Sequence, residues 1–108
     1  MKESYLGEFE HLVLLAVLRL SEEAYAVPIR ETIATHSGRS VARGALYTTL
    51  DRLEQKRLLR STMGDALPER GGRPRRYYTV TPAGLASIRA ARAAIDNLSR
   101  GISLDLAK

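Results

Sequence analysis

The sequence predicts a mainly α-helical fold with one small β-hairpin (α+β). Leu46, Leu50 and Leu53 lie at i, i+4 and i+7, so segment 42–56 is expected to be a helix with one apolar stripe facing a core. Further along, segment 70–76 gathers Arg, Gly and Pro into a basic turn between two short strands. The middle of the chain also carries most of the positive charge. A helix followed by a basic hairpin indicates a winged helix-turn-helix, flanked here by N- and C-terminal helices for dimerisation.

The charge distribution points to a polyanionic partner. Residues 1–38 hold three Lys/Arg against six Asp/Glu, residues 39–76 hold ten against four, and residues 77–108 hold four against two. The net charges are therefore −3, +6 and +2 for the three segments. A segregated basic region is typical of nucleic-acid binding. Charge alone does not distinguish nucleic-acid binding from an Arg-rich surface that contacts only solvent, and the two interpretations are about equal on this ground.

Length and composition limit the class of protein. A chain of 108 residues with 44% apolar residues suits a single globular domain. The chain has no cysteine, which excludes disulfides and thiolate zinc sites and suits a reducing compartment. The longest apolar run, 12–18, is too short to span a bilayer, and the N-terminus does not resemble a signal peptide. We therefore expect a cytoplasmic protein without a membrane segment.

The first expected helix, 6–20, is apolar on nearly all sides. One small domain can hardly cover such a helix, so a second subunit is expected to contact Leu14, Val17 and Leu18. The alternative is a helix at the centre of a monomer core. His11, within this helix, is expected to be a buried or half-buried core histidine.

A second helix is expected to begin near Pro28 and to end at Gly38, which suits the left-handed position after a last turn. His36 is placed to interact with the C-terminus of this helix. The third helix begins about four residues later, and two helices joined by such a turn form the helix-turn-helix unit.

Strands are expected at 58–63 and 75–80, with Tyr78 and Val80 facing the core. Thr81 is expected to cap a last helix with Pro82 at its first position. That helix should continue to about residue 101, with a heptad seam for dimerisation formed by Ile88, Ala91, Ile95, Leu98 and Ile102. We expect the DNA-binding domain to cover 1–80 and the dimerisation helix, packed on 6–20, to cover 81–108.

The outer face of helix 42–56 should meet double-stranded DNA through Ser40, Arg43, Gly44, Tyr47, Thr48 and Arg52. Thr48 and Arg52 are one turn apart and are the expected readers of base edges, since an arginine can bind guanine through two hydrogen bonds. Arg43 and Ser40, at the helix start, suit phosphates. Tyr47 suits a phosphate contact or packing on the domain surface equally well.

The expected wing, 64–76, supplies the second set of expected DNA contacts. Arg73 and Arg75 flank Pro74 and suit the minor groove, as arginines do in narrow A·T grooves. Arg70 and Arg76 suit phosphates. The alternative is pairing of these arginines with the carboxylates of the loop, which would be weak at an exposed site.

Two motifs resemble one known family. Segment 44–54 is similar to the G-T-L-Y…L…RLE stretch of PadR-like transcriptional regulators, and segment 72–81 is similar to the wing of that family. The resemblance covers nearly the whole chain and implies a winged helix-turn-helix dimer, usually a repressor that releases DNA on sensing a small molecule. Ala42 stands where the family often has Ser or Thr, and Ala26 where it commonly has Gly. Ser40 or a DNA phosphate would then cap the recognition helix.

Other functions fit less well. The acidic residues are scattered and Gly71-Gly72 lies in a hairpin rather than before a helix, so we expect no enzyme, no metal site and no cofactor. RNA binding is disfavoured because an open sheet with exposed aromatics is not predicted. The main alternative is a winged helix used as a protein-interaction module. A homodimer would read an inverted repeat with half-sites about 10 bp apart, and an effector would sit between the first and last helices.

Overall fold

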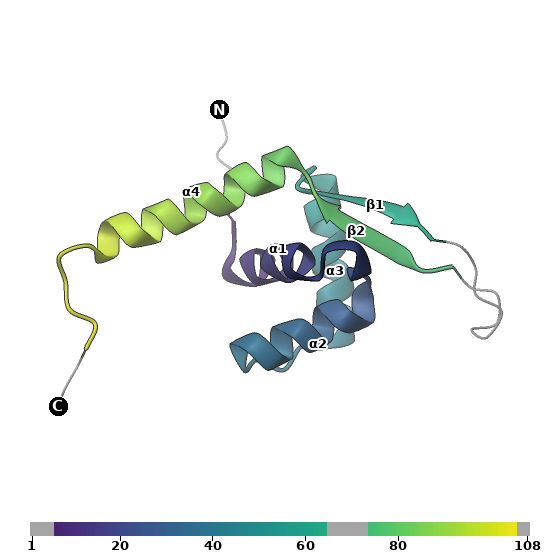
Figure 1. Ribbon diagram of the computed structural model, residues 1–108, viewed down its shortest axis with the longest axis horizontal. Coiled ribbons are helices and arrows are strands. Elements are labelled where there is room, and N and C mark those ends of the chain that lie inside the picture. Colours follow the sequence, from purple (N-terminus) through teal and green to yellow (C-terminus); the bar gives the residue numbers. More distant parts are fainter. Residues whose placement is uncertain (1–5, 65–73, 106–108) are drawn as a thin grey trace.

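The computed structural model describes residues 6–64 and 74–105. The chain is mainly helical, with one two-stranded antiparallel sheet (Figure 1). The elements in chain order are α1 Glu8–Leu20, the short 3₁₀ helix η1 Ser21–Glu23, α2 Ala26–Ser37, α3 Arg43–Gln55, β1 Leu59–Met63, β2 Arg76–Val80 and α4 Pro82–Ser99. The predicted fold class is confirmed, and each predicted helix and strand is present within a few residues of its expected bounds.

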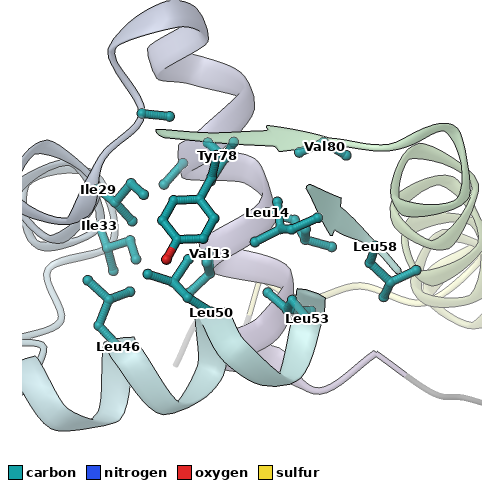
Figure 2. Close-up of a cluster of buried hydrophobic side chains, with 14 of the residues drawn as sticks. Val13, Leu14, Ile29, Ile33, Leu46, Leu50, Leu53, Leu58, Tyr78 and Val80 are labelled. Atoms are coloured by element: carbon teal, nitrogen blue, oxygen red, sulfur yellow. The ribbon is translucent and has the colours of Figure 1, made fainter. Parts of the chain in front are cut away.

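Helix α1 is the central element of the core. It packs against α2, α3, β2 and the first half of α4, all from the same chain. Val13 and Leu14 on α1 are fully buried among side chains from the other elements, with the Tyr78 ring beside them (Figure 2). The helix therefore lies at the centre of one chain's core, which was the alternative to contact with a second subunit.

The packing of α1 corrects part of the expected dimer interface. Leu14 is 0% exposed and Val17 is 2% exposed within a single chain, so neither has surface left for a second subunit. Ile88 on α4 is buried in the same core, at 6% exposure. The prediction was wrong for these three residues because α2, α3, β2 and α4 together surround α1. Leu18, in contrast, remains 43% exposed.

The turn between α2 and α3 is held from both sides. Gly38 adopts the left-handed conformation at the end of α2, with φ of 72°, as predicted. The Arg30 Nε donates to the Val41 carbonyl at 2.7 Å across the turn. His36 Nδ1 lies 3.1 Å from the Thr32 carbonyl in the last turn of α2, which is the structural role expected for it. Of these contacts, the Arg30–Val41 bond joins α2 to the segment that leads into α3.

The hairpin packs one face on the core. Leu59 pairs with Val80 and Ser61 with Tyr78 in the antiparallel register. Tyr78 and Val80 are buried, which confirms the predicted inward face. Burial raises the pKa of the Tyr78 phenol to about 12. The outer edge of β2 is bound as well, because the Tyr78 amide donates to the Ala24 carbonyl at 2.9 Å.

The start of α4 is anchored to the end of α3. The Thr81 hydroxyl accepts from the Gly84 amide at 3.0 Å, the expected N-cap, and donates to the Arg57 carbonyl at 2.7 Å. Gly84 lies so close to Leu58 and Val80 that a Cβ atom there would be 2.7 Å from Cγ1 of Val80. From this anchor α4 runs past α1, and its second half extends beyond the rest of the chain (Figure 1).

No helix within 6–64 or 74–105 is long and apolar enough to cross a membrane. The same residues contain no group of three or more His, Asp or Glu that could hold a metal ion.

Candidate nucleic-acid interface

Helix α3 presents a slim polar face to solvent. Its apolar stripe, Leu46, Leu50 and Leu53, is fully buried, so the opposite side turns outward. Gly44, Thr48 and Arg52 are all exposed there. A Cβ atom built on Gly44 would meet nothing within 4 Å, so no protein neighbour requires a glycine at this position. An exposed helix with so little bulk at its start fits the width of a DNA major groove.

The N-terminus of α3 has no side-chain cap. The helix begins after Ala42, whose side chain cannot accept a hydrogen bond, and Ser40 is exposed without acting as the cap. Of the two caps that the sequence allowed, Ser40 or a DNA phosphate, the structure excludes Ser40. The first amide groups of α3 therefore have no side-chain acceptor, and the exposed Arg43 is the first residue of the helix, an arrangement that suits a phosphate.

Two arginines of this face have no carboxylate partner in the part of the chain that the structure describes. Arg43 and Arg52 are exposed and form none of the ion pairs found within residues 6–64 and 74–105. Those pairs are Arg39 with Glu8, at 3.0 Å, and Lys56 with Glu10, at 2.9 Å. Both link α1 to the segments that flank α3.

The hairpin lies beside the last turn of α3. Arg76 Nη1 donates to the Ser61 hydroxyl at 3.0 Å, and that hydroxyl donates to Glu54 Oε2 at 2.6 Å. The chain of hydrogen bonds connects β2, β1 and the last turn of α3. The last turn of α3 and the hairpin are therefore joined by side-chain contacts, and Arg76 is exposed. Its guanidinium is engaged by a hydroxyl, and no carboxylate pairs with it in the described part of the chain.

Arg75 occupies a different place from the one expected. Its guanidinium lies over the ring of Tyr25, with Cζ 4.2 Å from the ring centroid. Arg75 thus packs on the start of α2, whereas the sequence suggested a free side chain for the minor groove. Pro74 is exposed. Arg70 and Arg73 lie outside the described residues and stay predictions from the sequence.

Comparison with known proteins decides the family. Residues 14–90 match the model of the transcriptional regulator PadR-like family, a span that includes the helix-turn-helix and the hairpin. The chain belongs to the PadR-like transcriptional regulators. It is a winged helix-turn-helix DNA-binding protein, and this family consists of regulators rather than enzymes.

Individual relatives agree with this assignment. The PadR-like chain is 36% identical over 80 residues to the transcriptional regulator Rv3488 of Mycobacterium tuberculosis, covering 74% of this chain and 70% of the relative. A PadR family regulator from Eggerthella lenta is 32% identical, with a TM-score of 0.68 over 87% of this chain and 81% of its own. A PadR-like transcription factor from Bacteroides fragilis is 28% identical, with a TM-score of 0.69 over 84% and 82%.

The second half of α4 leaves an apolar stripe uncovered in this PadR-like chain. Ile95 is 60% exposed, Leu98 is 82% exposed and Ile102, just after the helix, is 62% exposed. Ala91, one turn before Ile95, is half-buried. Another apolar surface lies between α1 and α2, where a groove of about 530 Å³ has Leu12, Leu15 and Leu18 in its lining. Large apolar side chains exposed in one row are typical of a protein interface.

The sequence did not reveal Tyr25, Glu10 and Lys56 as contributors to this region. Tyr25 precedes α2 and contacts β2, and Glu10 contacts Lys56 across 46 positions of the chain. Each contact joins segments far apart in sequence. The only local signal was an aromatic residue just before a helix, and such a residue does not by itself indicate which segment it contacts.

Proposed function

We propose that this PadR-like protein is a homodimeric repressor that acts in the cytoplasm and reads an inverted-repeat operator. In this proposal α3 enters the major groove, and the β1–β2 hairpin follows the backbone toward the adjacent minor groove. The main support is the outer face of α3, where exposed Arg43 and Arg52 flank the unobstructed Gly44 and Thr48.

The roles of the residues follow from their positions. Thr48 and Arg52 would contact base edges, because they lie mid-helix on the outer face. Arg43, Ser40 and the amides of the first turn would bind phosphates at the start of α3. Tyr47, which is 47% exposed on the flank, would bind a phosphate through its hydroxyl.

The wing would add electrostatic contacts. Arg76 would bind a phosphate from the loop end of β2, where its exposed side chain is hydrogen-bonded to Ser61. Arg70 and Arg73, with Pro74, would extend the contact along the minor groove, as expected from the sequence. Arg75 is not among these contacts, because its guanidinium lies on the ring of Tyr25.

Dimerisation would use the exposed stripe of α4, formed by Ala91, Ile95, Leu98 and Ile102, together with Leu18 of α1. A second copy is the occupant we propose, because a stripe presented at the free end of a helix can pair with itself about a two-fold axis. Two recognition helices related in this way match an inverted repeat. A small-molecule effector that releases the DNA would bind between α1 and α4 of the dimer.

Selection of bound fragments from a random DNA pool, at physiological salt, tests the proposal. The expected product is an inverted repeat with half-sites about 10 bp apart or a multiple of it. Affinity for the selected operator should fall steeply as salt rises, because arginine contacts to phosphates release counterions. Absence of any enriched sequence, with binding to protein partners instead, would favour the interaction-module alternative.

A further inference from the structure

An aromatic and cationic cluster lies where the hairpin meets the helix-turn-helix. It consists of Tyr25 before α2, Arg75 before β2, Tyr77 within β2 and Gly64 after β1. The Tyr25 and Tyr77 rings meet edge to face, with centroids 5.5 Å apart. Arg75 covers the ring of Tyr25, with Cζ 4.2 Å from its centroid. Such contacts depend on geometry, since a cation is attracted to the face of a ring and an edge to its π system.

Backbone contacts hold the same cluster together. The Gly64 amide donates to the Arg75 carbonyl at 2.6 Å, and the Tyr78 amide donates to the Ala24 carbonyl at 2.9 Å. A Cβ atom at Gly64 would lie 2.7 Å from Cε1 of Tyr77, so this glycine leaves room for the ring. The cluster therefore lies at the loop end of the two strands and joins β2 to the segment that leads into α2.

The guanidinium of Arg75 is turned toward this cluster. Arg75 and Tyr25 are half-buried, and the Nε atom of Arg75 is shielded from solvent without a hydrogen-bond partner within residues 6–64 and 74–105. A side chain reaching for DNA would be expected to point away from the domain. An isolated two-stranded hairpin is marginally stable, so its direction depends on its contacts with the rest of the domain.

We propose that Tyr25, Arg75 and Tyr77 form a strut that sets the angle of the β1–β2 hairpin against the helix-turn-helix. Arg75 is then a positioning residue rather than a contact to DNA. This inference rests on the proposed function, because the angle matters only if hairpin and α3 contact one DNA molecule together. The strut includes Tyr25, the residue directly before α2, and the turn after α2 leads into α3. The position of the hairpin is in this way linked through α2 to that of the recognition helix.

Operator affinity of four variants tests the strut. Tyr25→Leu removes the ring without changing the charge, and Arg75→Ala removes the cation. Each is expected to weaken operator binding about three- to tenfold, the size expected for a lost cation–π contact. The double variant should be no weaker than either single one, because both substitutions break one unit. Tyr25→Phe keeps the ring and should bind within about twofold of wild type.

Arg60→Ala is the matched control for charge. Arg60 is exposed on β1 of the same hairpin, so the variant loses one positive charge and keeps the cluster. It should bind more tightly than Arg75→Ala. If instead Tyr25→Leu binds like wild type while Arg75→Ala is weakened, Arg75 contacts DNA directly and the strut is wrong. Full affinity in both single variants would also overturn it.

Hydrogen–deuterium exchange supplies a readout that does not need DNA. In Tyr25→Leu the amides of Gly64 and Tyr78 should exchange faster, while those of α3 keep their wild-type rates. Unchanged exchange at both amides would refute the strut. If the wild-type protein selects no operator, the proposed function fails, and the exchange result alone then decides whether the strut exists.

Discussion

Lys56 Nζ, at the end of α3, donates to both carboxylate oxygens of Glu10 on α1, at 3.1 and 2.9 Å. Glu10 also accepts from the Gly7 amide at 2.9 Å, so one buried carboxylate closes the start of α1 and holds the end of α3. The position of the recognition helix on the core thus depends on an ion pair as well as on leucines. The sequence pattern assigns no partner to Lys56, and the structure pairs it with Glu10.

The contact gives stability a specific pH dependence. Burial alone would raise the pKa of Glu10, but the Gly7 amide, the Lys56 ammonium and the charge of Arg52 outweigh it and hold the pKa below its usual 4.5. The stabilisation is therefore complete above the unfolded-state pKa and is lost as pH falls through the lower folded-state pKa. Urea unfolding should show the advantage of wild type over Glu10→Gln shrinking between about pH 6 and pH 3. A constant difference would contradict this.

Removing the cation tests the same contact at neutral pH. Lys56→Met leaves the buried Glu10 without its partner and should lower the free energy of unfolding by about 1–3 kcal/mol. Glu8→Gln is the matched control, because it breaks the exposed Arg39–Glu8 pair, which should contribute less than about 1 kcal/mol. Equal losses in the two variants would show that burial of the Glu10 pair has no consequence.

Gly84 is a position where the fold needs a glycine. Gly84→Ala would place a methyl group against the Leu58 carbonyl and the Val80 side chain, within a helix whose first turn is anchored to the α3–β1 turn. We expect a loss of about 1–3 kcal/mol in the free energy of unfolding, from overpacking. Chemical denaturation measures it. Wild-type stability would mean that α4 can shift without cost.

Gly44, in contrast to Gly84, should accept an alanine without loss of stability. A Cβ atom there meets nothing, so Gly44→Ala should stabilise α3 by up to about 1 kcal/mol. Gly44→Leu should fold but bind operator at least about tenfold more weakly, because bulk at the start of α3 keeps it from the groove. Thermal unfolding and binding titrations measure the two effects. Wild-type affinity of the leucine variant would place the interface elsewhere.

Arg52→Ala should relax base preference at one position of each half-site. The expected loss of discrimination there is about 1–3 kcal/mol, the value of a bidentate arginine–guanine contact. Titrations against operators with single base changes measure it, with Gln55→Ala, on the same exposed face, as the control. A uniform loss on all operators would instead assign Arg52 to phosphate.

Leu98→Glu should convert the dimer to a monomer. Leu98 is 82% exposed in one chain, so a carboxylate there costs the monomer little but would be buried in the proposed interface. Sedimentation equilibrium should show dimerisation weakened about 30-fold or more, as for an interface hot spot. Ala93→Glu, exposed on another side of α4, should leave the dimer intact. Dimers of unchanged strength in Leu98→Glu would exclude this stripe.

The sequence by itself determined the local elements and the outer face of α3. The i, i+4, i+7 spacing of Leu46, Leu50 and Leu53 dictates which side of a helix is buried, whatever packs against it. Gly38 and Thr81 mark helix ends because their conformational and hydrogen-bonding preferences act within a few residues. The resemblance to the PadR-like family, carried by two local motifs, needed no coordinates either.

Only the tertiary structure decided which apolar and charged residues remain free. Leu14 and Leu98 are both apolar helix residues, yet one is enclosed by four elements of its own chain and the other is open. Arg75 and Arg76 are adjacent, yet one lies on the Tyr25 ring and the other on the Ser61 hydroxyl. The physical reason is that burial and pairing are set by neighbours far apart in sequence, and periodicity carries no information about them.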